Sequence, residues 1–205
     1  MIAIVDYGMG NLRSVEKALI HLSYDAKITN EPEAVLKADK LILPGVGAFA
    51  DCLSGLKNSG LYDAVLEFIS SGKPFLGICV GMQMLYEKSF EFGIHKGIGI
   101  FSGAIKKFPD DIVKEGMKIP HMGWNQVNFI KQHRVFNGIE NMTNFYFVHS
   151  YYAPVNDDET IAVCEYGTIF AAAVAKDNVI ATQFHPEKSQ KAGLKFLQNF
   201  GEWKC

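Results

Sequence analysis

The chain has 205 residues, of which 48% are hydrophobic and 20% are charged, a balance typical of a globular protein. Lys and Arg number 20 against 22 Asp and Glu, so the formal net charge is -2, and no long run of like charge occurs. These values argue against a protein that binds nucleic acid or an anionic membrane surface through its overall charge.

A chain of this length can bury about 70% of its unfolded surface without disulfide or metal support. No repeat, low-complexity tract or linker divides it, so we expect one domain over residues 1–205. Its four cysteines, at positions 52, 79, 164 and 205, form no Cys-x-x-Cys pair, which disfavours a metal site. The first strand reaches Asp6 too early for a signal peptide, and no apolar run is long enough to span a membrane, so we expect a cytoplasmic protein.

The first half of the chain alternates short apolar runs with amphipathic segments. Residues 2–5 predict a buried strand, and Asn11 is placed to cap a helix whose apolar positions follow at 12, 15, 19 and 22. Further elements are predicted as strands at 40–43 and 74–78 and as helices near 48–57, 61–71 and 81–86. Strands that are apolar throughout and separated by helices favour a parallel sheet covered on both faces.

The second half, from about residue 97 to 184, has a different character. Aromatic and β-branched residues predict strands at 126–130, 145–149, 160–165, 169–174 and 179–184. Turn-forming residues separate these strands, and a last helix is predicted near 189–200. Because we expect mixed or antiparallel strands here, the predicted fold class is α/β, with a mostly parallel central sheet flanked by helices and an antiparallel extension.

The segment 75–83 carries the strongest chemical signal. It places Cys79 between Gly77 and Gly81, after an apolar strand and before a helix, as in the Gly-x-Ser-x-Gly nucleophile elbow with cysteine in place of serine. Such a turn holds the nucleophile in a strained backbone conformation, and the glycines let strand and helix approach each other. We expect an exposed sulfur, a thiolate favoured by the helix N-terminus, and a Val80 amide that faces an oxyanion. A small buried cysteine in a tight turn is the alternative.

A nucleophilic cysteine needs a base, and His185 is the best placed of the six histidines because it comes just after a predicted strand. Glu187, two residues further on, can reach the second imidazole nitrogen and fix the tautomer of the ring. A surface His–Glu pair is the alternative interpretation. His121, beside Pro120, is either a functional group or a hydrogen-bonding residue within a packed loop.

Residues 44–49, with the sequence PGVGAF, follow the apolar strand at 40–43. The glycines free backbone amides to turn toward a neighbouring site, so this turn is a candidate for a second oxyanion donor, or else an ordinary connection between strand and helix. The glycines at 8 and 10 do not form a dinucleotide-binding fingerprint, because position 13 is Arg where a third glycine is required. No nucleotide cofactor is therefore expected.

In combination, GICVGMQ at 77–83, PGVGAF at 44–49 and HPEKS at 185–189 resemble the class I (triad) glutamine amidotransferases. The segments 6–12, 120–125 and 146–152 resemble, within that family, the glutaminase subunits of imidazole glycerol phosphate synthases. The resemblance runs from residue 1 to about residue 200. Val80 stands where the family usually has Leu, and this departure has little consequence because only its amide is needed.

The resemblance implies a flavodoxin-like domain that hydrolyses L-glutamine to glutamate and ammonia through a thioester on the cysteine. We expect no cofactor and no metal. The residues that it assigns are Cys79, His185 and Glu187 for catalysis; Val80 with Gly45, Val46 and Gly47 for the oxyanion hole; and Gln83, His149, Ser150 and Tyr151 for glutamine binding.

The resemblance also implies a (β/α)8 cyclase subunit that forms a heterodimer with this chain and receives ammonia through a tunnel. In that family the glutaminase is nearly idle alone, because its oxyanion turn is misaligned until the partner and its ligand bind. A Pro-Gly-Val-Gly turn suits such a switch between two backbone states of similar energy. The candidates for the docking face, chosen because they lie on or next to strand-end loops, are Met9, Asn11, Trp124 and Lys188.

Three functions remain open from the sequence. The first is the glutaminase subunit of imidazole glycerol phosphate synthase in histidine biosynthesis. The second is the same chemistry in a paralogue that supplies ammonia to a sugar-amidating synthase for a surface polysaccharide or flagellin glycan. The third is a catalytically silent regulatory subunit, against which the intact cysteine, histidine and glutamate argue. A cysteine peptidase or chaperone on a related fold is a more distant fourth.

Overall fold

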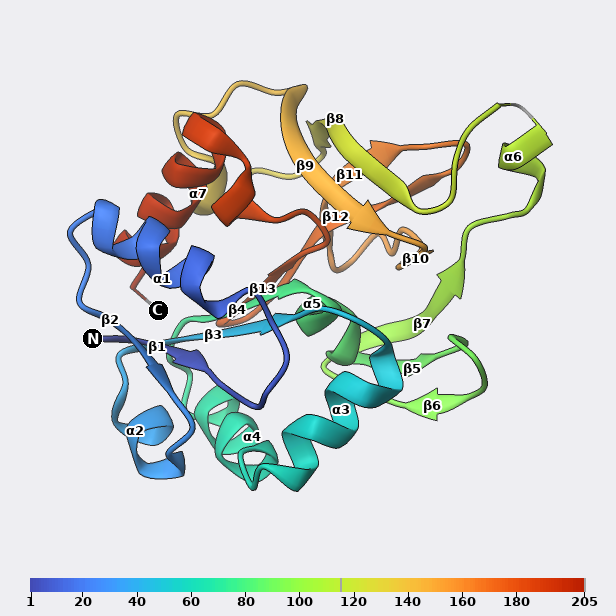
Figure 1. Cartoon of the computed structure of the whole chain (residues 1–205). Helices are drawn as coiled ribbons and strands as arrows, with labels where there is room; N and C mark the ends of the chain where they lie inside the picture. Colours follow the sequence, from blue (N-terminus) through green and yellow to red (C-terminus); the bar gives the residue numbers. More distant parts are fainter. Residues whose placement is uncertain (115, 205) are drawn as a thin grey trace.

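The computed structural model describes residues 1–114 and 116–204, and a nine-stranded sheet forms its centre (Figure 1). Five neighbouring strands are parallel: β2 (Ala26–Thr29), β1 (Ile2–Val5), β3 (Lys40–Gly45), β4 (Phe75–Cys79) and β13 (Val179–Thr182). Four more continue the sheet in antiparallel order: β12 (Ile169–Lys176), β11 (Thr160–Glu165), β8 (His121–Phe129) and β9 (Thr143–His149). The expected α/β fold with an antiparallel extension is confirmed.

Helices cover both faces of the parallel half (Figure 1). On one face lie α1 (Leu12–His21) and α7 (Gln190–Glu202), and on the other lie α2 (Pro32–Lys37), α3 (Phe49–Asn58) and α4 (Tyr62–Ser70). A second sheet has the strand order β10 (Tyr151–Tyr152), β7 (Phe101–Lys107), β5 (Tyr86–Ser89) and β6 (His95–Lys96). The short helices are α5 (Val80–Met84), α6 (Asp111–Lys114) and the 3₁₀ turns η1 (Arg134–Phe136) and η2 (Pro186–Lys188).

The apolar strands explain this layering. Every residue of β1, β4 and β13 is buried, because helices remove both faces of these strands from water. The outermost strand, β2, is only partly buried, as expected for an edge. Since β3, β4 and β13 are parallel neighbours, their carboxyl ends meet at one edge of the sheet, which is where open α/β sheets form their sites.

Several sequence predictions are corrected by the structure. The segment between α1 and β3 contains β2 and α2, which were not predicted, and residues 86–107 form most of the second sheet. Strand β8 begins at His121 rather than at residue 126, so His121 lies in a strand and not in a loop. The polar residues in the first part of β8 give no strand pattern in the sequence, although this part pairs with β9 from His121 to Val127. Asn11 does precede α1, but its side-chain oxygen accepts from the Ser14 hydroxyl instead of a backbone amide.

Two further features concern the termini and the helices. Cys205, the last of the four cysteines, lies outside the described residues. Within the described ranges, no helix combines the length and the apolar character that crossing a bilayer requires.

Gly81 allows α5 to lie against β3. A Cβ atom on Gly81 would stand 1.9 Å from the Leu43 carbonyl oxygen, which is backbone and cannot move aside. We predict that Gly81→Ala lowers the free energy of unfolding by about 3 kcal/mol or more, because the overlap forces strand and helix apart. Denaturant unfolding measures this loss. Gly55→Ala in α3, where the nearest atom is 3.3 Å away, is the control and should change stability by less than about 1 kcal/mol; equal effects would contradict the prediction.

Candidate active site

Cys79 is the last residue of β4 and directly precedes α5, as the elbow motif predicts. Its φ of +55° is left-handed, a conformation that costs a non-glycine residue roughly 1–3 kcal/mol. Hydrogen bonding of β4 to β3 and β13 on either side holds the strand that leads into this turn. The expectation of an exposed sulfur is corrected, because Cys79 is only 4% exposed and borders a narrow cavity of about 170 Å³.

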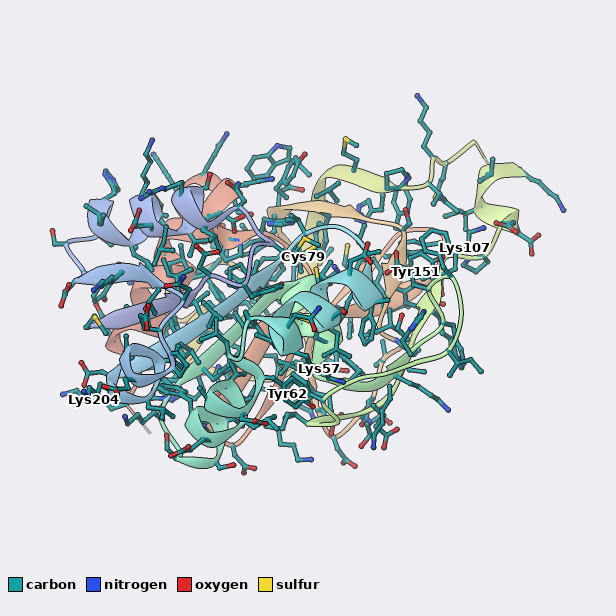
Figure 2. The ribbon with its side chains drawn as sticks, turned by 60° about the horizontal axis from the view of Figure 1, so that its bottom comes forward. Lys57, Tyr62, Cys79, Lys107, Tyr151 and Lys204 are labelled. Carbon is teal, nitrogen blue, oxygen red and sulfur yellow. The ribbon has the colours of Figure 1, made fainter. Side chains whose placement is uncertain are left out.

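The cavity gathers most of the residues that the sequence singled out. Figure 2 places Cys79 near the middle of the molecule, with Tyr151 to its right. The residues that border the cavity are Val46 and Gly47 of the turn after β3; Cys79, Val80 and Gln83 of the elbow; Glu91; Val148, His149, Ser150 and Tyr151; and His185. Segments far apart in the sequence therefore meet at one point, at the carboxyl ends of β3 and β4.

His185 and Glu187 form a buried pair next to the cavity. The His185 Nδ1 atom lies 2.8 Å from the Glu187 Oε1 atom, and the two side chains are 2% and 1% exposed. His185 is held by its backbone amide, which donates to the Tyr146 carbonyl, and η2 begins at the following Pro186. Within the described part of the chain, the buried Nε2 atom of His185 has no hydrogen-bond partner. This nitrogen is thus available to a reacting group in the cavity.

The electrostatics of His185 favour the protonated ring. Burial opposes protonation, but the negative charge of the Cys79 thiolate and the carboxylate of Glu187 outweigh it and raise the pKa of His185 to about 10. Glu187 also fixes the ring, since its oxygen accepts from Nδ1 and leaves Nε2 to face the cavity. A positively charged imidazole beside a cysteine is the arrangement that nucleophilic thiolates require.

The turn after β3 lies against the elbow. Gly45 is paired with Cys79 across the two parallel strands, and a Cβ atom on Gly45 would come within 2.7 Å of the Gly81 nitrogen. Gly47 has a φ of +99°, which a residue with a side chain adopts only under strain. Val46 and Gly47 border the cavity, whereas Gly45 is not among the residues that line it. The structure therefore brings the candidate oxyanion turn and the amide of Val80 to the same cavity as the sulfur.

Hydrogen bonds hold the turn after β3 at the Pro44 carbonyl, at the Val46 carbonyl and at the Phe49 amide, where α3 begins. The Tyr7 hydroxyl donates to the Pro44 carbonyl at 2.8 Å, and the Cys52 thiol donates to the Val46 carbonyl at 3.3 Å. At the start of α3, the Phe49 amide donates to a Glu91 carboxylate oxygen at 2.6 Å. Burial raises the pKa of the Cys52 thiol to about 11, so this thiol keeps its proton and remains a donor.

The residues predicted to hold glutamine also reach the cavity. Both hydrogens of the Gln83 amide are used within the protein, by the Tyr151 carbonyl at 3.1 Å and by the Gln183 Oε1 atom at 2.9 Å. Gln83 therefore offers its oxygen, not its nitrogen, to a ligand. His149 is buried, and its Nδ1 atom lies 2.8 Å from the Tyr151 carbonyl, so the segment 149–151 is braced from inside.

The four candidates for a docking face all lie outside this cavity. Trp124, on β8, is 45% exposed and its ring meets the Tyr146 ring edge-on, while the Lys188 ammonium lies 5.6 Å from the centre of the same Tyr146 ring. Met9 and Asn11 lie in the connection between β1 and α1, and α1 contacts η2, which contains Lys188. Met122, which the sequence analysis did not single out, is 63% exposed and lies two residues before Trp124 on β8.

The structure adds two side chains to the site that the sequence analysis did not single out. Glu91 borders the cavity from the loop after β5, and nothing in its sequence context signals a function. Gln183 is completely buried, with its Nε2 atom 3.8 Å from the Cys79 sulfur. Gln183 could have been noticed, because it stands two residues before His185 in the same strand-end segment.

The fold and the site together define a glutamine amidotransferase. The profile of the family described as "Glutamine amidotransferase class-I" matches residues 3–202, and the chain belongs to this family. Within it, the chain is 50% identical over 205 residues to imidazole glycerol phosphate synthase subunit HisH of Syntrophotalea carbinolica, covering 98% of this chain and all of that protein. It is 52% identical over 207 residues to subunit HisH of Caldanaerobacter subterraneus subsp. tengcongensis, and both chains are covered completely.

Solved structures share the fold at much lower sequence identity. A crystal structure of a glutamine amidotransferase has a TM-score of 0.73 at 19% identity and covers 98% of this chain and all of that chain. The structure of PurLQS from Thermotoga maritima has a TM-score of 0.73 at 17% identity and covers 98% of this chain and 97% of that chain. These likenesses confirm the fold.

Removal of the Cys79 sulfur should change the charge of His185. In Cys79→Ala the thiolate no longer favours the imidazolium, so we predict that burial lowers the pKa of His185 relative to the intact protein. The ring nitrogens report this directly in an NMR titration from pH 5 to 10. The imidazolium signal should persist to higher pH in the intact chain than in the variant. Identical titrations in both proteins would show that the pKa of His185 does not depend on the Cys79 sulfur, and would contradict the prediction.

Proposed function

We propose that this chain is the glutaminase subunit of an imidazole glycerol phosphate synthase, which hydrolyses L-glutamine and delivers ammonia to a partner subunit. The observation that carries the chemistry is the strained Cys79 in one cavity with the unpaired Nε2 atom of the buried His185–Glu187 pair. The assignment to this synthase is supported by relatives named as its HisH subunit, at about 50% identity over their full length.

In the first half of the proposed reaction, the Cys79 thiolate attacks the carboxamide carbon of glutamine and a carbon–sulfur bond forms. The carbonyl oxygen becomes an oxyanion, which the Val80 amide and an amide of the turn at 45–47 stabilise. The imidazolium of His185 then gives its Nε2 proton to the amide nitrogen as the carbon–nitrogen bond breaks. Ammonia leaves, and a γ-glutamyl thioester remains on Cys79.

In the second half, neutral His185 takes a proton from water as the water oxygen attacks the thioester carbon. Collapse of the tetrahedral species breaks the carbon–sulfur bond and restores the thiolate and imidazolium. The product leaves with its γ-carboxyl group protonated and becomes glutamate when it loses this proton to solvent. Glu187 orients the ring in both halves, and its charge offsets that of the imidazolium inside the protein. The net reaction consumes glutamine and water and yields glutamate and ammonia.

The cavity also suggests how glutamine is recognised. Glu91 is the acidic side chain among the described residues that border it, so we assign Glu91 to the α-ammonium group of the substrate. The Gln83 oxygen then accepts from a substrate N–H, and the backbone of Ser150 and Tyr151 borders the same space. In each pair a donor meets an acceptor: the ammonium group meets the Glu91 carboxylate, and the substrate N–H meets the Gln83 oxygen.

The proposed partner is a (β/α)8 cyclase subunit in a heterodimer. We assign its docking face to the exposed surface around the Tyr146 ring, where Trp124 and Lys188 converge, with Met9 and Asn11 on the neighbouring loop.

We also infer a cytoplasmic location, because Cys79 must stay a reduced thiol and free thiols persist there. Neither the sugar-amidating nor the silent alternative is favoured by a specific feature of the cavity.

The central test combines the chain with the cyclase subunit from the same genome, its ribulosyl nucleotide substrate and glutamine. We predict that imidazole glycerol phosphate forms, and that Cys79→Ala abolishes product formation from glutamine but leaves formation from ammonia intact, because only glutamine hydrolysis needs the sulfur. Equal loss of both activities would show that Cys79 is not the glutaminase nucleophile. No product from glutamine with the intact chain, together with normal product from ammonia, would favour the sugar-amidating paralogue.

Substitution of Glu91 should affect glutamine binding. Glu91→Gln keeps an acceptor for the Phe49 amide but removes the negative charge, so we predict that KM for glutamine rises about tenfold or more while kcat changes little. Glu87→Gln is a matched control, because the Glu87 carboxylate also accepts from a backbone amide, that of Gly103, but lies outside the cavity. An unchanged KM in the Glu91 variant would remove Glu91 from the substrate site.

Lys188→Ala should weaken coupling to the partner. We predict that stimulation of glutamine hydrolysis by the cyclase falls several-fold, since the ammonium group lies over Tyr146 at the proposed docking face. Lys57→Ala is the control. The Lys57 ammonium lies 5.2 Å from the centre of the Tyr62 ring, so this substitution removes the same kind of contact at a site outside the proposed docking face (Figure 2). If both variants respond alike, the docking face is wrongly assigned.

A further inference from the structure

Gln183 is a buried amide that takes part in none of the proposed catalytic steps. It directly follows β13, its backbone amide donates to the Ala172 carbonyl at 2.9 Å, and its side chain is 0% exposed. Its Nε2 atom lies 3.8 Å from the Cys79 sulfur, and its Oε1 atom accepts from Gln83 at 2.9 Å. Gln183 is thus fixed by Gln83 at one end of its amide and lies against the Cys79 sulfur at the other.

The Tyr151 carbonyl decides which end of the Gln183 amide faces the sulfur. A carbonyl oxygen only accepts, so Gln83 must present its nitrogen to it, as it does at 3.1 Å. The same nitrogen of Gln83 donates to Gln183, which therefore presents its oxygen to Gln83. The remaining end of Gln183, the N–H group, is directed at Cys79. The hydrogen-bond partners themselves impose this order.

The Tyr151 carbonyl also accepts from His149, which in turn is hydrogen-bonded to His121. His149 donates to the carbonyl from Nδ1 at 2.8 Å, so the His149 Nε2 atom carries a lone pair and must accept. The His121 Nδ1 atom, 3.0 Å away, is then the donor, and the His121 Nε2 atom accepts from Asn125 at 3.3 Å. Both rings are neutral, because burial lowers the pKa of His121 to about 4 and that of His149 to about 3.

We propose that Gln183 is a catalytic residue that stabilises the Cys79 thiolate with an N–H donor whose direction the Tyr151 carbonyl enforces through Gln83. The proposal rests on the proposed function in one respect, that Cys79 is the nucleophile. An amide N–H can only donate, so it favours the sulfur as a charged acceptor over the protonated thiol. The donor is already oriented and fully desolvated, so it reorganises little during the reaction.

The test measures the rate at which iodoacetamide alkylates Cys79 between pH 5 and 10, without glutamine or a partner, with the labelled peptide identified by mass spectrometry. Gln183→Met keeps the length and burial of the side chain but removes the donor. We expect alkylation near pH 6.5 to slow by about tenfold, and the rates to converge at high pH where every molecule carries the thiolate. Gln183→Glu, which places a carboxylate there, should slow it further.

The other titratable groups around Cys79 are the same in all variants. His185, His149 and Glu91 border the cavity, while Tyr7 and Cys52 lie close enough for charge interactions with the sulfur. Thr182→Val is the matched control, because Thr182 is equally buried and its hydroxyl donates to the Phe184 carbonyl instead of to the sulfur. Its alkylation profile should match that of the intact chain.

A measurement on the intact chain covers the case in which the Gln183 variants fail to fold. The side-chain amide protons of Gln183 should shift in NMR spectra with the same pH midpoint as Cys79 alkylation, because the N–H group senses the sulfur charge. An insensitive amide, or a folded Gln183→Met with an unchanged alkylation profile, would overturn the proposal. Failure of the chain to make ammonia from glutamine is a separate result, which would refute the proposed function but not the thiolate contact.

Discussion

The close approach of α5 to β3 is the constraint on which the site depends. The backbone of the elbow runs so near to Leu43 that a single methyl group at Gly81 would overlap its carbonyl oxygen. This contact fixes the start of α5, and Cys79 takes up the strained φ that joins strand to helix. The sheet's hydrogen bonds on both sides of β4 compensate the strain, so Cys79 is placed by rigid elements and not by a loop.

Charge inside the molecule follows from the same placement. A buried imidazolium is costly unless anions lie beside it, and here one anion is the orienting carboxylate and the other is the thiolate itself. The raised pKa of His185 therefore depends on Cys79 as well as on Glu187. His149, which borders the same cavity, and its hydrogen-bond partner His121 are neutral instead, because burial lowers the pKa of both rings.

The Tyr151 carbonyl connects two parts of the fold that the sequence keeps apart. It belongs to the short strand β10 of the second sheet, directly after β9 of the large one, and it accepts from both His149 and Gln83. Through His121 this carbonyl is tied to β8, whose exposed residues include Trp124 and Met122. A continuous chain of hydrogen bonds therefore runs from β8 to the Tyr151 carbonyl and on, through Gln83 and Gln183, to the Cys79 sulfur.

The sequence by itself determined the elements with strong periodicity and the residues with a fixed local geometry. Strand, turn and helix around Cys79, and the two-residue step from His185 to Glu187, are local relations that a motif encodes, and all were found where expected. Only the tertiary structure decided the positions of Glu91 at the cavity and of Gln183 beside the sulfur, the start of β8 at His121, and the burial of the sulfur. Each of these depends on which distant segment lies opposite, and polar residues such as Asn125 or Glu91 carry no periodic signal from which that pairing could be predicted.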